Sequence, residues 1–127
     1  MRNVVVSLAL VVTLGACAEE STIGYPTVDR ALEALHRDAH AKFTTEGGWT
    51  IVTTKENGTP VIWSFAPKGH PAYPAAVKRT IVQSAGAVFI DMKAFCSGTQ
   101  SACDKLVGEF RDTNERFIQN LSWAREF

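Results

Sequence analysis

The chain has 127 residues, with 13 Lys or Arg and 13 Asp or Glu, so its formal net charge at pH 7 is zero. This length suits one small domain with a single hydrophobic core. The basic residues form no run along the sequence. Their spacing argues against nucleic acid as a partner and against electrostatic binding to anionic lipid.

Residues 1–16 predict a secretion signal. Arg2 provides a positive charge, and the run from Val4 to Val12 is apolar. This run is much shorter than the roughly 20 apolar residues that a transmembrane helix requires. Small residues follow it, as they do before a signal-peptidase site. We therefore expect residues 1–16 to be removed on export.

The residues Leu14, Gly15, Ala16 and Cys17 resemble the lipobox of bacterial lipoproteins. The resemblance covers residues 1–17 only, and we recognise no family for the rest of the chain. It implies that signal peptidase II cuts before Cys17, whose sulfur then carries diacylglycerol and whose amine carries a fatty acyl chain such as palmitate. Several acyl chains attach a protein stably to a membrane. The alternative is an ordinary secretory signal, with cleavage at the Ala-x-Ala-like site Ala16-Cys17-Ala18.

Ala18 bears on localisation. By resemblance to lipoprotein sorting in Gram-negative cells, Asp after the cysteine retains a protein in the inner membrane. Ala18 at that position implies the inner leaflet of the outer membrane, with the domain facing the periplasm. Residues 17–26 are small and polar, with Gly24 and Pro26 as breakers. They predict a lipidated tether ahead of a single small periplasmic domain over residues 27–127.

An amphipathic helix is predicted after the tether. Thr27 suits the N-cap position, and apolar residues recur at helical spacing as far as Phe43. Gly47-Gly48 is predicted to end the element. Two i,i+4 ion pairs are expected on the polar face, namely Glu33–Arg37 and Asp38–Lys42.

Residues 49–66 carry the clearest hairpin signal. Asn57-Gly58 is the favoured dipeptide for a two-residue type I′ turn, because both positions need a positive φ. Pairing across that turn places Val52 opposite Trp63 and Thr50 opposite Phe65. Both faces of this hairpin then carry apolar residues. We expect one face to be covered and the other to be partly exposed.

The segment after this hairpin is harder to interpret. Residues 67–76 hold three prolines and predict a loop. Residues 77–83 are ambiguous, because Pro74 and Gly86 could bracket a helix, whereas the β-branched residues 80–82 favour a strand. We prefer a second hairpin with strands near 77–83 and 87–93. A three-residue turn at Ser84-Ala85-Gly86 would join them.

A C-terminal helix and a disulfide complete the predicted fold. Ser101 and Asp104 resemble a capping box. Cys96 and Cys103 predict a disulfide in an exported protein, whereas a redox or zinc site would need a different spacing or further ligands. The sequence thus predicts an α+β fold. It has an N-terminal helix, a four-stranded antiparallel meander and a C-terminal helix, with both helices on one sheet face.

Three histidines are the only candidates for a metal site. His36 and His40 are four residues apart, so a continuous helix would place them on one face, and His70 could supply a third ligand. Solvated residues on the polar side of the helix are the simpler interpretation, because the His-Glu-x-x-His signature is absent. The sequence implies no cofactor.

Catalysis has little support in the sequence, which contains neither a nucleophile elbow nor a phosphate-cradling glycine loop. Asp91 is the one acid inside a predicted strand. We interpret it as an outward-facing residue paired with Lys93 or Arg79. A small periplasmic enzyme or metal-binding protein using His36, His40, His70 or Asp91 remains the alternative function.

The Pro-rich link after the first hairpin is the more interesting surface feature. Trp63 and Phe65 precede it, and it contains His70 and Tyr73. Aromatic anchors carry much of the energy of protein interfaces, so these four residues are a candidate binding surface. The alternative is a plain connector whose aromatic rings cover the sheet. We therefore predict a non-enzymatic module, an adaptor or inhibitor, that binds another envelope protein.

Overall fold

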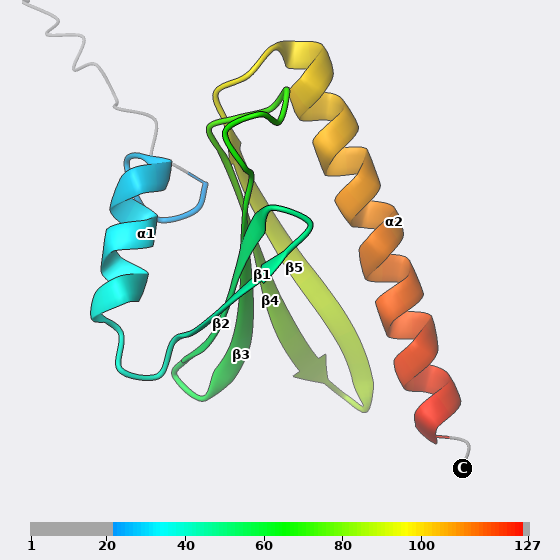
Figure 1. Ribbon diagram of the computed structural model, residues 1–127. Coiled ribbons are helices and arrows are strands. Elements are labelled where there is room, and N and C mark those ends of the chain that lie inside the picture. The colour runs from blue at the N-terminus through cyan, green and yellow to red at the C-terminus, as the bar shows by residue number, and fades with distance from the viewer. Residues whose placement is uncertain (1–21, 126–127) are drawn as a thin grey trace, which may run out of the picture.

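The computed structural model describes residues 22–125, with side chains described for residues 22–121. Residues 14–17, which resemble a lipobox, lie outside this range. Within it, a helix, five antiparallel strands and a second helix follow one another, which gives an α+β fold (Figure 1). The strands lie in the sheet in their sequence order. The elements are α1 (Val28–Arg37), β1 (Lys42–Glu46), β2 (Trp49–Glu56), β3 (Thr59–Phe65), β4 (Ala75–Ser84), β5 (Ala87–Cys96) and α2 (Gln100–Arg125).

The first helix is shorter than predicted, and a fifth strand takes the place of its last turns. Asp38 follows α1 as its C-cap. Residues 42–46 form β1, which pairs with β2 across a turn at Gly47-Gly48, where φ is 55° and 84°. The glycine pair is therefore a hairpin turn and not a helix stop. The predicted Asp38–Lys42 helix pair is wrong, because Lys42 lies in the strand.

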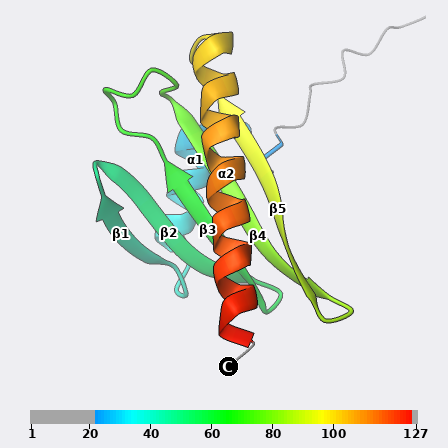
Figure 2. The same cartoon turned by 90° about the vertical axis from the view of Figure 1, so that its right-hand side faces the viewer.

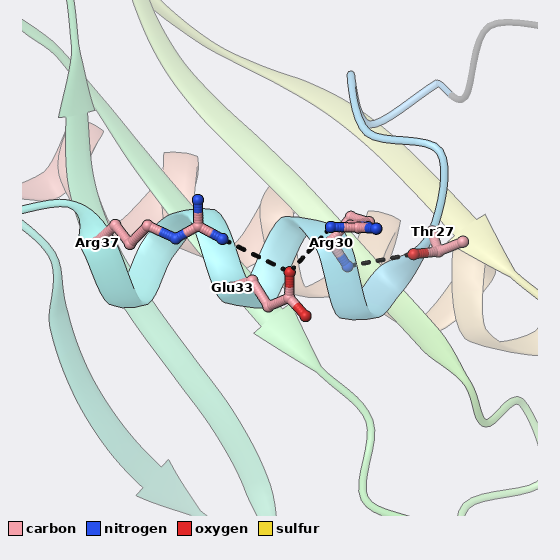
Figure 3. A network of polar contacts seen from close by, with 4 residues as sticks. All are labelled: Thr27, Arg30, Glu33 and Arg37. Carbon is pink, nitrogen blue, oxygen red and sulfur yellow. Dashed lines mark hydrogen bonds and ion pairs between the residues drawn. The ribbon is translucent and has the colours of Figure 1, made fainter.

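The start and the polar face of α1 agree with the sequence prediction. The Thr27 hydroxyl accepts a hydrogen bond from the backbone N–H of Arg30, at 3.1 Å (Figure 3). Glu33 lies between two arginines, 3.4 Å from Arg30 and 3.6 Å from Arg37 (Figure 3). These ion pairs lie on the solvent-exposed face of α1 and contribute little to the free energy of unfolding.

The two helices cover opposite faces of the sheet (Figures 1 and 2). Ala31 and Leu35 of α1 belong to one core cluster with Val52 and Trp63. Leu106 of α2 belongs to a second cluster, on the other face. The prediction that both helices share one face is wrong. Because both faces of the central strands are apolar, each face needs its own cover.

The β2–β3 hairpin has the predicted register. Val52 pairs with Trp63, and Thr50 pairs with Phe65. The turn at residues 57 and 58 has φ values of 51° and 79°, as a type I′ turn requires. The prediction from the Asn-Gly dipeptide is therefore confirmed.

The second hairpin is confirmed, and its strands are longer than predicted. Its turn differs by one residue, because Ser84 pairs directly with Ala87. The turn therefore holds only Ala85 and Gly86, with φ values of 50° and 80°. A two-residue turn places Val82 opposite Phe89, whereas the predicted three-residue turn would have placed another residue there.

The end of the predicted tether belongs to the domain. Ile23 is only 1% exposed and packs in the α1 core cluster, with Tyr25 against it. The Thr22 hydroxyl donates a hydrogen bond to the carbonyl oxygen of Ala94 at 2.6 Å. The folded unit thus includes residues that were expected to be linker. Among residues 22–125, no helix has the length and apolar character needed to cross a membrane.

The predicted disulfide is confirmed. It joins Cys96, the last residue of β5, to Cys103 in the first turn of α2, with 5.8 Å between the two Cα atoms. The cap of α2 is Thr99, whose hydroxyl accepts the backbone N–H of Ala102 at 3.1 Å. The predicted capping box at Ser101 is therefore wrong by two positions.

Candidate functional site

The predicted aromatic surface is divided between the core and the exterior. Trp63 is 1% exposed and Phe65 is 4% exposed. Their rings stack on each other with 5.7 Å between centroids, on the α1 side of the sheet. Neither residue can contact a partner without unfolding of the core. These two residues are therefore wrong as members of the predicted binding surface.

His70 and Tyr73 lie in the loop between β3 and β4. The His70 Nδ1 atom accepts the backbone N–H of Ala72 at 3.0 Å, and its ring meets the edge of Trp49 at 5.1 Å between centroids. His70 therefore shapes the loop. Tyr73 is 39% exposed, and the bond between it and Pro74 is cis. Of the four predicted residues, Tyr73 has the most accessible ring.

The candidate metal and catalytic residues do not converge. His36 stacks on Phe43 of β1 with 4.4 Å between ring centroids. His40 follows the end of α1, so it does not share a helix face with His36. Asp91 forms an exposed ion pair with Lys93, at 3.6 Å. Among the described residues, no three His, Cys, Asp or Glu side chains are grouped closely enough to hold a metal ion.

Asp38 is the acid with a clear structural role. Its carboxylate accepts hydrogen bonds from the Thr54 hydroxyl at 2.5 Å and from the backbone N–H of His40 at 2.9 Å. These bonds, the Thr54 bond first, lower the pKa of Asp38 below its usual value. Both bonds favour the ionised form. The bond to Thr54 attaches the connection between α1 and β1 to β2.

The β4–β5 hairpin continues past the last pair between β3 and β4. The β3–β4 ladder ends at the pair Val61–Thr80, whereas the β4–β5 ladder continues to the turn. In this part of the hairpin, Val82 and Phe89 are cross-strand neighbours. They are 36% and 54% exposed, which makes Phe89 the most exposed of the large hydrophobic residues in the described range. We call this pair, with the turn at residues 85–86, the hairpin tip.

A groove lies beside the hairpin tip. Its volume is about 580 Å³, and it separates the β2–β3 turn from residues 80–83 of β4. Glu56, at its rim, forms an ion pair with Lys78 at 3.0 Å. The tip, the groove and this ion pair place apolar surface next to charged groups of both signs. Sequence reasoning missed this site because the predicted turn length put Val82 and Phe89 out of register.

We found no match to the chain among protein-family models, curated proteins or solved structures. The geometry of the α+β domain and its exposed surfaces therefore provide the basis for assigning a function.

Proposed function

We propose that this chain is a lipid-anchored protein of the bacterial envelope, and that its domain binds another envelope protein through the hairpin tip. The exposed Val82–Phe89 pair carries the proposal. Isolated exposed apolar residues are ordinary, but an aromatic and a β-branched residue facing each other beside a groove form a compact anchor. Interfaces combine such an apolar centre with a polar rim.

The same face of the β4–β5 hairpin carries both signs of charge, four residues along each strand from the Val82–Phe89 pair. Lys78 and Lys93 are directly opposite each other on β4 and β5. Each is paired with an acid, Lys78 with Glu56 and Lys93 with Asp91. Like charges at opposed strand positions repel unless they are compensated. Compensated pairs on the same face as the apolar centre give specificity without excess charge.

The lipobox resemblance at Leu14–Cys17 supports the anchor, which would attach the chain to the membrane through Cys17. Five residues, the number from Cys17 to Thr22, reach at most about 18 Å when extended. Thr22 is bonded at Ala94, close to the disulfide end of β5. Within the hairpin tip, Phe89 lies five residues before Ala94, or about 17 Å away, and Gly86 in the turn lies eight residues before it, or about 26 Å at 3.3 Å per residue. Figure 1 shows this tip at the end opposite the β5–α2 connection. An anchored domain would therefore present the tip away from the membrane.

Site-specific crosslinking in cells tests the binding surface. A photoreactive residue at position 89 should give an adduct with one envelope protein, and the same residue at position 73 should not. The two positions are exposed aromatics at opposite ends of the domain, which makes Tyr73 a matched control for Phe89. An adduct at position 73 alone would place the surface on the β3–β4 loop, and adducts at neither position would reject the proposal.

Substitution adds a quantitative test. Phe89→Ser should abolish recovery of the crosslinked protein while leaving the thermal midpoint of the domain nearly unchanged, because the side chain is half exposed. Tyr73→Ser should preserve recovery. A large fall in the midpoint of Phe89→Ser would instead show that the residue stabilises the fold.

The anchor is tested separately. Cells fed a fatty-acid analogue should label the protein, and Cys17→Ser should remove both the label and membrane fractionation. The crosslink at position 89 tests binding whether or not Cys17 is acylated, so failure of one half of the proposal is distinguishable from failure of the other. Membrane association that persists in a processed Cys17→Ser protein would contradict the anchor.

A further inference from the structure

Arg79 occupies an unusual position on the opposite face from the hairpin tip. It lies on β4, in register with Ile62 of β3 and Met92 of β5, on the side that α2 covers. Its guanidinium carbon is 5.1 Å from the centroid of the Phe110 ring. Its Nη2 atom donates to the Ser64 hydroxyl at 3.3 Å. Stacking and this hydrogen bond hold the guanidinium in one orientation.

The guanidinium of Arg79 lacks a counter-charge. Among the described side chains, the ion pairs of the domain join other residues, and the Nε atom of Arg79 is buried with no acceptor. Burial lowers the pKa of this guanidinium. A cation that is partly removed from water without a partner is costly, and an incoming carboxylate would offset that cost.

The face beside Arg79 is open. Figure 2 shows that α2 crosses the sheet and leaves β1 and the adjoining part of β2 uncovered on this side. Thr44 and Thr53 are exposed here, and Ile51 and Ile62 are half-buried. The side chains of these residues alternate onto the same face as Arg79 through the strand register. The result is a mixed apolar and polar surface that ends at a cation.

Two lysines continue the positive charge across this face. Lys42 lies in the same cross-strand row as Arg79, and Lys55 lies one step along β2 on the same side. Both are exposed, and both line a hollow of about 350 Å³ at the edge of the sheet. On the strands of this open face, Glu46 is the acid that accompanies them. The surface is therefore predominantly basic, although the chain as a whole is neutral.

We propose that this face, which extends from Arg79 across Ile62 and Ile51 to Lys42 and Lys55, binds an acidic peptide segment. One carboxylate of the segment pairs with the Arg79 guanidinium, and apolar side chains lie on the two isoleucines. A second carboxylate reaches the lysines. The surface is open and sheet-like, which suits an extended peptide better than a small ligand that would need enclosure.

Strand spacing sets the separation of the two carboxylates. Arg79 and Lys42 lie three strands apart, which is about 14 Å at roughly 4.8 Å per strand. Two glutamates four residues apart in an extended peptide are separated by about 13 Å. The best segment therefore has glutamates at positions i and i+4 with leucines between them. This surface is on the other side of the sheet from the hairpin tip, so it does not depend on that proposed site.

Fluorescence anisotropy with a labelled, end-blocked peptide of this pattern tests the proposal. The glutamate peptide should bind saturably to the mature domain, and affinity should fall with added salt because the contacts are charged. A peptide with glutamine at both positions is the control. A peptide with glutamates at i and i+2 should bind more weakly than the i,i+4 peptide. Equal binding of the glutamine control would overturn the proposal.

Variants identify the anchor. Arg79→Gln should weaken binding by about tenfold or more, because a guanidinium binds a carboxylate through two hydrogen bonds. Arg79→Lys keeps the positive charge but cannot form the two parallel hydrogen bonds of a guanidinium, so it should give an intermediate loss of affinity. Lys68→Gln, which changes an exposed lysine in the β3–β4 loop, should change affinity less than twofold. If Arg79→Gln retains its thermal midpoint and binds as well as the unaltered domain, the assignment of Arg79 is wrong.

Should Arg79→Gln fail to fold, an NMR titration of the unaltered domain replaces it. The Nε–Hε resonance of Arg79 should shift saturably with the glutamate peptide, and that of the exposed Arg111 should not. A titration that saturates without moving the Arg79 resonance would overturn the site.

Discussion

Ile23 offers the sharpest test of where the folded domain begins. As part of a tether, its side chain would contribute nothing to stability. In the structure it is 1% exposed and packs with Val28, Leu35 and Trp63 in the α1 core cluster. Ile23→Ala removes three carbons at about 0.8 kcal/mol each, which is about 2.4 kcal/mol before any cavity that remains. Buried Ile→Ala substitutions cost about 2–5 kcal/mol, so we expect about 3 kcal/mol.

The assay is thermal and urea unfolding of the mature chain carrying Cys17→Ser, which removes any acyl chain. A loss of about 3 kcal/mol lowers the thermal midpoint by roughly 12 °C or more in a domain of this size. Ile23→Val should cost only about 0.5–1.5 kcal/mol. Thr22→Ala, one residue earlier, should cost at most about 1 kcal/mol, because it removes one exposed hydrogen bond. If Ile23→Ala unfolds within about 0.5 kcal/mol of the unaltered chain, a value typical of surface substitutions, the packing of this segment is refuted.

Three further outcomes are expected from unfolding experiments. Replacing Cys96 and Cys103 together with Ser should cost roughly 2–3 kcal/mol, from the loop that the disulfide closes; an unchanged urea midpoint would contradict this. The depressed pKa of Asp38 means that its bond to Thr54 stabilises the fold above the unfolded pKa, near 3.8, and that this stabilisation is lost as pH falls through the lower folded value. Asp38→Asn should therefore reduce the fall in the free energy of unfolding as pH is lowered into the acid range. An acid dependence identical to that of the unaltered chain would contradict this role for Asp38. Gly98→Ala should lower the thermal midpoint, since the new Cβ would lie 2.6 Å from a backbone oxygen of the β3–β4 connection; an unchanged midpoint would mean that the loop yields freely.

The parts of the fold that were predictable have strict local requirements. A type I′ turn needs two positive φ values, and Asn57-Gly58 meets that need better than most dipeptides. The β2–β3 register follows once the turn is placed. The Cys96–Cys103 disulfide follows from the pairing of thiols in exported proteins. Each of these features depends on neighbours in sequence.

The errors arose where one pattern satisfies two structures. Gly47-Gly48 ends helices and also forms hairpin turns, and the spacing from Leu35 to Phe43 fits a helix. The structure forms the turn, because β1 then pairs along the open edge of β2. At the second hairpin, Ala85 has a φ of 50°, which a non-glycine residue rarely adopts. Sequence alone therefore favoured the longer turn.

The candidate site was less predictable than the fold, because it depends on which helix covers which face. Trp63 and Phe65 are aromatic residues at strand spacing, and that pattern is the same for a core and for an exposed patch. The position of α1 decides between them and buries both residues. Val82 and Phe89 have the same pattern, but they lie in the part of β4–β5 that extends past the last β3–β4 pair.

Covalent and hydrogen-bond constraints are concentrated at one end of the domain, and the apolar tip lies at the other end. At the end of the sheet near Thr22, the disulfide joins β5 to α2, and the Ser97 N–H donates to Pro74 at 2.9 Å. Ala72, in the loop between β3 and β4, is fully buried there. At the other end, the β4–β5 ladder continues without a β3 partner. The domain therefore has a cross-linked base at the end where the proposed anchor would attach and an exposed apolar tip at the other end. If the chain is anchored and binds a partner as we propose, a rigid base would hold the tip in a fixed orientation, which would reduce the conformational freedom lost on binding.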